Sequence, residues 1–157
     1  YCIDEDGNQY MIDNLKKDSV FGEPFLLPEE SQHYYVCAKS ETRVLFIAYE
    51  HVIKRCENAC KFHSQLVSNL LQMIALRASQ QANRIYVLSR NSIRKKIMTY
   101  LNSIAAEKQT KTVILPMSYT TLAEYLSVDR SAMMRELKNL ADEGIIERDG
   151  KKLRILD

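Results

Sequence analysis

The chain of 157 residues is poor in glycine and proline, with only four of the first and three of the second. Loops that hold a phosphate group against backbone N–H groups are rich in glycine, so a nucleotide-binding loop of that kind is not expected. The three histidines are scattered, and neither a Ser/His/Asp set nor a pair of carboxylates stands out. The sequence therefore predicts that the protein is not an enzyme.

Long apolar runs are missing as well. No stretch approaches the roughly 20 apolar residues that a membrane-spanning helix needs, and the first residues do not have the pattern of a signal peptide. The overall make-up, 46% apolar and 27% charged, is typical of an ordinary globular protein. These features predict a soluble, cytoplasmic protein of one or two domains that has no membrane partner.

Cysteine is scarce and is not arranged in pairs of the CxxC type. Two of the four cysteines, Cys56 and Cys60, are four residues apart and could share one face of a helix. Such a pair could act as a redox couple or as half of a metal site, although two small packed residues are the plainer interpretation. The sequence predicts no metal site and leaves any cofactor unknown.

The most informative stretch begins at Ser118, which suits a helix N-cap. A short apolar-faced helix follows, then a turn at Ser127-Val128 and a second helix that Asp129 can cap. In this second helix Met133, Leu137 and Leu140 recur every three or four residues and would face the core. The pattern predicts a helix-turn-helix, whose second helix enters the DNA major groove.

A basic hairpin follows this pair of helices. The second helix should stop at Gly144, and Asp149-Gly150 predicts a type I′ turn between two short strands. We call residues 147–155 the wing. Its Arg148, Lys151 and Lys152 are suited to contact phosphate groups.

Charge is divided unevenly along the chain. Residues 1–89 contain 9 Lys+Arg against 11 Asp+Glu, and residues 90–157 contain 13 against 9. The net charges are therefore −2 and +4, and the basic excess accompanies the helix-turn-helix. This is expected of the half that meets DNA phosphates.

The first part of the chain predicts strands and turns, followed by a long helix. A hairpin turn at residues 6–8 should join strands at 1–4 and 9–12, and further short strands are expected at 36–38 and 44–47. A short helix is expected near 49–56, and a helix without Gly or Pro at 59–88. On that helix apolar positions repeat every 3.5 residues, which favours a coiled-coil dimer over packing within one chain. The predicted dimer seam consists of Val67, Leu71, Ile74, Ala78, Gln81, Ile85 and Leu88.

The order of these parts resembles the Crp/Fnr superfamily of bacterial transcription regulators. The residues that carry the resemblance are Phe21-Gly22-Glu23 with Leu26-Leu27, the seam helix, and the stretch from Leu122-Ala123 through Arg135 to Gly144-Ile146. The resemblance implies an α+β fold. Its expected parts are an incomplete β-roll at 1–57, a dimerisation helix at 58–89 and a winged-helix DNA-binding domain at 90–157.

The resemblance also implies roles for single residues. Glu23 matches a ligand-binding glutamate of the β-roll, and Gln81 lies where nucleotide-bound members touch the base. The Arg-Ser pair that holds a cyclic phosphate is replaced by Gln32-His33, so cyclic AMP is not the expected effector. The implied DNA-contacting residues are Arg130, Ser131, Arg135 and Lys138 on the second helix, Ser118, Tyr119 and Thr120 on the first, and Lys151 and Lys152 in the wing.

Together these features predict an allosteric, sequence-specific transcription regulator. Its expected partners are double-stranded DNA with a pseudo-palindromic operator, a second copy of the chain, RNA polymerase and a small-molecule effector. Two alternatives stay open at this point. One is a signal-binding or protein-interaction module that does not read DNA, and the other is a thiol or metal redox sensor.

Overall fold

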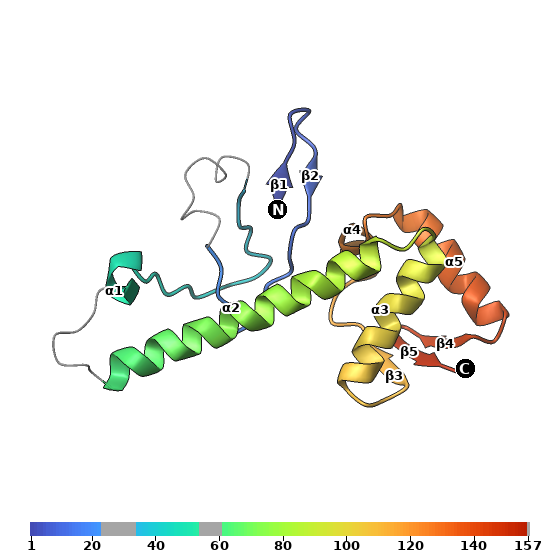
Figure 1. Cartoon of the computed structure of the whole chain (residues 1–157). Coiled ribbons are helices and arrows are strands. Elements are labelled where there is room, and N and C mark those ends of the chain that lie inside the picture. The colour runs from blue at the N-terminus through green and yellow to red at the C-terminus, as the bar shows by residue number, and fades with distance from the viewer. Residues whose placement is uncertain (23–33, 54–60, 157) are drawn as a thin grey trace. The chain divides into compact units, whose positions relative to one another are not determined.

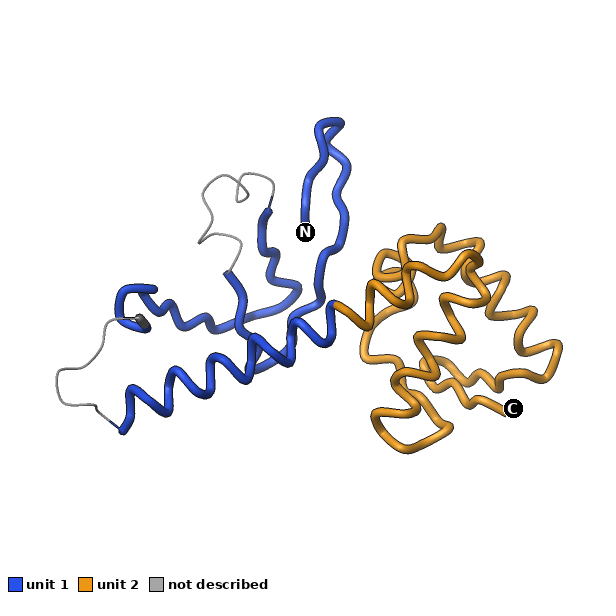
Figure 2. Tube along the Cα trace, in the orientation of Figure 1, with its two compact units in different colours: residues 1–81 blue, residues 82–157 orange. Residues whose placement is uncertain are grey.

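The computed structural model describes residues 1–22, 34–53 and 61–156 (Figure 1). The chain forms two compact units, Tyr1–Gln81 and Ala82–Asp157, whose boundary falls inside the long helix (Figure 2). Each unit is described separately below. Glu23, Cys56 and Cys60 lie outside the described residues, and the predicted boundaries at 57/58 and 89/90 stay predictions.

The first unit begins with the predicted hairpin. Strands β1 (Cys2–Ile3) and β2 (Gln9–Tyr10) pair antiparallel, which confirms the predicted pairing of these segments. The turn is held by the Asp4 carboxylate, whose Oδ1 accepts hydrogen bonds from the backbone N–H groups of Asp6 and Asn8 at 3.0 and 2.7 Å. The Asn8 side-chain amide also donates to Asp4 Oδ2 at 3.0 Å, and this hydrogen bond contributes most to keeping the pKa of Asp4 below its usual value.

Two predicted strands do not form. Residues 36–38 and 44–47 have no strand structure, although the second segment, Val44-Leu45-Phe46-Ile47, is rich in β-branched and aromatic side chains. The side chains of Leu45 and Phe46 are 83% and 89% exposed. Strand propensity measures how well a residue fits a paired and half-buried surface, and neither segment is paired with a neighbouring strand within the described residues.

Two helices complete the first unit. The short helix α1 (Tyr49–Ile53) lies within the predicted 49–56 range. The long helix α2 (Lys61–Leu88) has 28 residues and confirms the predicted helix at 59–88 over all of its described residues (Figure 1). Among the described residues, no helix is long and apolar enough to cross a membrane.

The second unit is a three-helix layer on a small sheet. After the end of α2 come α3 (Ile93–Glu107), β3 (Thr112–Ile114), α4 (Tyr119–Leu126), α5 (Arg130–Asp142), β4 (Ile146–Asp149) and β5 (Lys152–Ile155). The sheet has the strand order β3-β5-β4, and all its pairs are antiparallel. This order of elements confirms the predicted winged helix.

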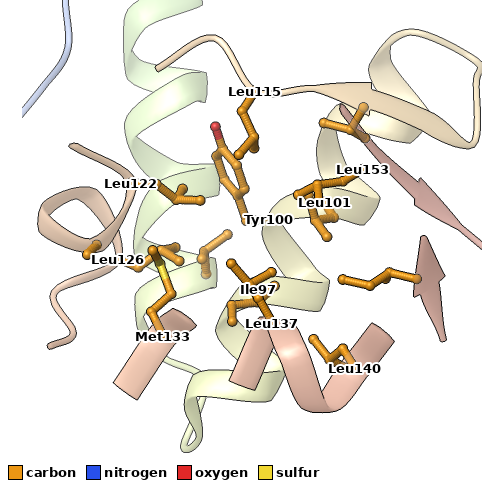
Figure 3. Close-up of a cluster of buried hydrophobic side chains, with 14 residues drawn as sticks. Ile97, Tyr100, Leu101, Leu115, Leu122, Leu126, Met133, Leu137, Leu140 and Leu153 are labelled. Carbon is orange, nitrogen blue, oxygen red and sulfur yellow. The ribbon is translucent and has the colours of Figure 1, made fainter. Parts of the chain in front are cut away.

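The core of the second unit is apolar and continuous (Figure 3). Ile97 and Leu101 from α3, Leu126 from α4 and Leu137 from α5 meet there, each no more than 1% exposed. The three predicted core residues of α5 are all fully buried, because the spacing of three or four residues keeps them on one face. Removing this much apolar surface from water provides the main stabilisation of the unit.

The wing turn differs from its prediction. Strand β4 extends through Asp149, which pairs with Lys152, so the two-residue turn is Gly150-Lys151. Of these two turn residues, only Gly150 has a positive φ, of 53°. Positive φ at the first turn residue alone is the type II′ pattern, so the predicted type I′ turn at Asp149-Gly150 was wrong by one residue.

Candidate nucleic-acid interface

Both helices of the helix-turn-helix begin at a residue that caps them. The Ser118 hydroxyl accepts a hydrogen bond from the Thr121 N–H at 3.0 Å, and the Asp129 carboxylate accepts one from the Ala132 N–H at 2.8 Å. Each cap satisfies one of the four N–H groups that a helix start leaves unpaired. The remaining N–H groups and the helix dipole make the start of α4, which an uncharged hydroxyl caps, a favourable place for an anion such as phosphate.

Helix α5 has one buried face and one basic, exposed face. Met133, Leu137 and Leu140 are completely buried. The four residues predicted to meet DNA from this helix are all exposed: Arg130, Ser131, Arg135 and Lys138. A helix anchored on one side by apolar packing can present these polar groups in fixed positions on the other side.

The wing adds a second group of exposed cations. Lys151 and Lys152 at the turn and Arg148 on β4 are all exposed, and Arg148 shares a surface hollow with Met134 and Lys138 of α5. Phosphate oxygens bind cations of this kind without regard to base sequence. The structure thus brings the predicted residues of α5 and the wing into one compact unit.

The three residues predicted at the start of α4 have different environments. Thr120 is exposed, whereas the Ser118 hydroxyl is engaged in the cap. Tyr119 is half-buried, and its hydroxyl donates a hydrogen bond to the Gly150 carbonyl oxygen of the wing turn. Burial raises the pKa of the Tyr119 phenol, although the nearby Arg148 cation works in the opposite direction.

The turn between α4 and α5 carries backbone strain. Ser127 closes α4 with φ 50° and ψ 58°, which is the left-handed conformation that glycine adopts at little cost. The conformation is held by hydrogen bonds from the N–H groups of Ser127 and Val128 to the carbonyl oxygens of Glu124 and Ala123, both at 3.1 Å. A serine is therefore held in a conformation that would suit glycine.

Two cations bind the last carbonyl groups of α4. Arg84 donates from Nε and Nη2 to the Tyr125 carbonyl oxygen at 3.2 and 3.1 Å, and its guanidinium also lies over the Tyr125 ring. Lys96 Nζ donates to the Leu126 carbonyl oxygen at 3.2 Å. Positive charge is favourable at a helix C-terminus, so these contacts stabilise α4 and fix it against the end of α2 and the start of α3.

An ion-pair cluster joins α3 to α5. Arg94 Nε lies 2.6 Å from Glu136 Oε1, while its two terminal nitrogens bind both carboxylate oxygens of Glu143. These hydrogen bonds raise the pKa of the Arg94 guanidinium, and those to Glu143 contribute most. The same contact holds the pKa of the Glu143 carboxyl below its usual range. The cluster ties the start of α3 to the middle of α5 and to its C-cap residue Glu143.

The residues predicted for the sensor and the dimer lie on or before α2. Gln81 is exposed on this helix, and Glu23 falls outside the described residues. Arg77 of α2 is tied to the preceding segment: its Nε lies 3.4 Å from Asp13 Oδ2 and its Nη1 donates to the Val20 carbonyl oxygen at 2.6 Å.

The predicted seam is exposed along most of its length. Leu71 is 66% exposed, and only Leu88 among the seam residues is half-buried. The half-buried positions that precede Leu88, including Leu66, Leu70, Met73 and Arg77, form a different face of the helix. Large apolar side chains in a regular exposed row are characteristic of a surface that another helix covers.

The supporting contacts were not predicted from the sequence. Arg84, Arg94 and Lys96 act on partners that are 30 to 49 residues away in the chain. No local spacing indicates such partners, because they meet only when the helices pack. The sequence shows the basic residues at the start of α3, but it does not indicate that their partners are the carbonyl groups of α4 and the carboxylates of α5.

Comparisons with known proteins agree with this architecture. A family model of the cyclic nucleotide-binding domain matches residues 1–59, and one of the Crp-like helix-turn-helix domain matches residues 95–157. The chain is 40% identical over 70 residues to the "Probable transcriptional regulator flp" of Lacticaseibacillus casei, a match that covers 45% of this chain and 32% of the relative. The chain thus spans about a third of that curated relative.

A solved structure shares the fold. The structure of FixK2 from Bradyrhizobium japonicum matches with a TM-score of 0.53 and 21% sequence identity, over 64% of this chain and 52% of FixK2. The two family models cover successive stretches on either side of the long helix α2, in the order that the sequence predicted. With the winged helix of the second unit, these matches give the chain the domain order of a Crp/Fnr-type regulator, a cyclic nucleotide-binding domain followed by a Crp-like helix-turn-helix domain.

Proposed function

We propose that the chain acts as a homodimeric transcription regulator that binds double-stranded DNA through its second unit. The observation that carries the proposal is the division of α5 into a completely buried apolar face and an exposed face with Arg130, Ser131 and Arg135 near its start. A recognition helix needs this division, because rigid anchoring places its polar side chains at the base edges.

The residues have distinct expected roles. Arg130 and Arg135 can each form two parallel hydrogen bonds with a guanine, which provides roughly 1–3 kcal/mol of discrimination for each good pair. Lys138, Lys151 and Lys152 suit phosphate oxygens, as does the start of α4 with Ser118 and Thr120.

The dimer follows from the exposed seam of α2. Pairing two copies along this seam would set two recognition helices about one DNA turn, roughly 34 Å, apart over a pseudo-palindromic operator. The net charge of +4 in residues 90–157 is modest for DNA binding, so two copies should bind far better than one.

Control by a signal is the second part of the proposal. Helix α2 contributes Arg77 to contacts within the first unit and Arg84 to contacts within the second. A small-molecule effector bound near Gln81 and Glu23 would favour one of two arrangements of α2, which shifts the population of DNA-competent dimers. The proposed setting is the cytoplasm, with RNA polymerase as the downstream partner.

The direct test is binding to duplex DNA over a range of salt concentrations. Random-sequence DNA should bind at low salt, and the logarithm of the binding constant should fall linearly with the logarithm of the salt concentration. Lys151→Gln should weaken binding to all sequences and lower this slope by about 1. Lys108→Gln, an equal charge change outside the proposed interface, should leave the slope unchanged.

Base reading needs its own variant. Selection of preferred sites from random DNA should show that Arg135→Ala loses its preference at one position in each half-site, while the affinity for random DNA changes little. An unchanged preference would remove Arg135 from base reading. Absence of salt-dependent binding by the unmodified chain would instead support the alternative of a module that does not read DNA.

The redox alternative rests on residues that the structure does not describe. Cys56 and Cys60 lie outside the described ranges, and in the described part of the chain no group of three or more His, Cys, Asp or Glu residues could hold a metal ion. No described contact favours this alternative, and titration of the thiols with metal analysis would test it.

A further inference from the structure

Tyr119 connects two parts of the candidate interface that are distant in the sequence. It is the first residue of α4, and its hydroxyl donates to the carbonyl oxygen of Gly150, 31 residues later, at the turn of the wing. The guanidinium of Arg148 lies over its ring, 5.4 Å from the centroid. The ring and the hydroxyl of one side chain therefore contact both a strand of the wing and its turn.

A second hydrogen bond fixes the same turn. The N–H of Leu115 donates to the Lys151 carbonyl oxygen at 2.9 Å. Both carbonyl groups of the two-residue turn thus accept hydrogen bonds, one from the first residue of α4 and one from the segment that leads into it. A two-stranded hairpin is marginally stable by itself, so these two contacts, together with the pairing to β3, determine where its tip lies.

We propose that Tyr119 is a positioning residue that holds the wing, so that Lys151 and Lys152 meet the DNA backbone at a fixed place relative to α5. The inference rests on the proposed function and departs from the expectation that Tyr119 itself touches phosphate. A hydroxyl that already donates its one proton to Gly150 has no further proton to offer a phosphate oxygen. Burial raises the pKa of this phenol, so the proton stays in place at neutral pH.

A double-mutant cycle on DNA binding tests this role. Tyr119→Phe keeps the ring and removes the hydroxyl, and the paired change Lys151→Gln with Lys152→Gln removes the charges that the wing would deliver. In the unmodified chain, Tyr119→Phe should weaken binding to random duplex DNA by about 5-fold, the factor expected for one hydrogen bond of ordinary strength. In the Gln background it should cause less than about a 2-fold further loss, because there is no wing charge left to misplace.

Thr120 provides the matched control for the cycle. It is the next residue of α4, it is exposed, and it carries the same predicted phosphate role. Thr120→Val should weaken binding by an equal factor in both backgrounds. Equal losses for Tyr119→Phe in the two backgrounds, or no loss in the unmodified chain, would overturn the positioning role.

Hydrogen exchange separates this inference from the proposed function. In Tyr119→Phe without DNA, the Leu115 amide should exchange about 5-fold faster, because its acceptor lies in the loosened turn. The Leu137 amide in α5 should keep its rate, which shows that the unit as a whole is not destabilised. If the unmodified chain does not bind DNA, the proposed function fails while this exchange result still stands. An unchanged Leu115 rate would overturn the inference even if DNA binds.

Discussion

The two units of the chain differ in how they bury apolar surface. All but one of the buried apolar side chains among the described residues lie in the second unit, and the exception is Met11. The described part of the first unit instead exposes many large apolar side chains, on the segment 44–47 and along α2. The second unit therefore provides its own core. The described part of the first unit instead leaves apolar side chains exposed, as a surface that packs against another protein surface does.

This difference matches the proposed division of labour. A DNA-reading unit must be rigid before it meets DNA, because ordering a loose unit on binding weakens affinity. A dimerising helix must leave apolar residues exposed in the single chain, because its stabilisation comes from the partner. Four measurements would sharpen or break the comparison, and they follow in order of expected effect.

The largest effect should come from the core of the second unit. Leu137→Ala removes a completely buried side chain and should lower the free energy of unfolding by about 2–5 kcal/mol. Leu45→Ala, at an 83% exposed position of the first unit, should change it by less than about 0.5 kcal/mol. Urea denaturation followed by circular dichroism measures both. A comparable loss from Leu45→Ala would show that the first unit has a core of its own.

The seam should respond next. Leu71→Asp places a charge in the proposed helix pair and should raise the dimer dissociation constant by at least about 100-fold, or nearly 3 kcal/mol. Because Leu71 is largely exposed in the single chain, the stability of the second unit should not change. Sedimentation velocity gives the oligomeric state. Ser68→Asp, on α2 outside the seam, is the matched control, and a dimer that tolerates Leu71→Asp would contradict the seam.

A smaller gain is expected at the turn of the helix-turn-helix. Ser127→Gly relieves a left-handed conformation and should raise the stability of the second unit by about 0.5–1 kcal/mol, after subtracting the greater freedom that glycine has in the unfolded chain. Thermal unfolding measures the change. Ser103→Gly, within helix α3, should destabilise by a similar amount and serves as the opposite-sign control.

The smallest effect should be the pH dependence of the Arg94 cluster. The pKa of Glu143 is lowered in the folded state by the hydrogen bonds from Arg94, so its stabilisation is present above the ordinary glutamate pKa and is lost as pH falls through the lowered value. Glu143→Gln should therefore lower the melting temperature slightly at about pH 7, and the difference from the unmodified chain should shrink as the pH falls below the ordinary glutamate pKa of about 4.3. A difference that persisted at low pH would contradict the ion pair as the cause.

Local patterns predicted the second unit closely and the first unit less well. The caps at Ser118 and Asp129 and the buried residues of α5 depend on neighbours within one or two helical turns, which the sequence shows directly. The strands at 36–38 and 44–47 were wrong because pairing depends on a partner strand, which composition does not reveal. The wing turn was displaced by one residue for the same reason: strand register set its position.

The sequence by itself determined the helical periodicities, the caps, the charge difference between the halves and the resemblance that the family matches later confirmed. Only the tertiary structure decided that Arg84 and Lys96 bind the end of α4, that Arg94 joins α3 to α5, and that the Tyr119 hydroxyl is engaged by the wing. These contacts join residues 30 or more positions apart, and a hydrogen bond forms only where packing brings a donor within about 3 Å of its acceptor.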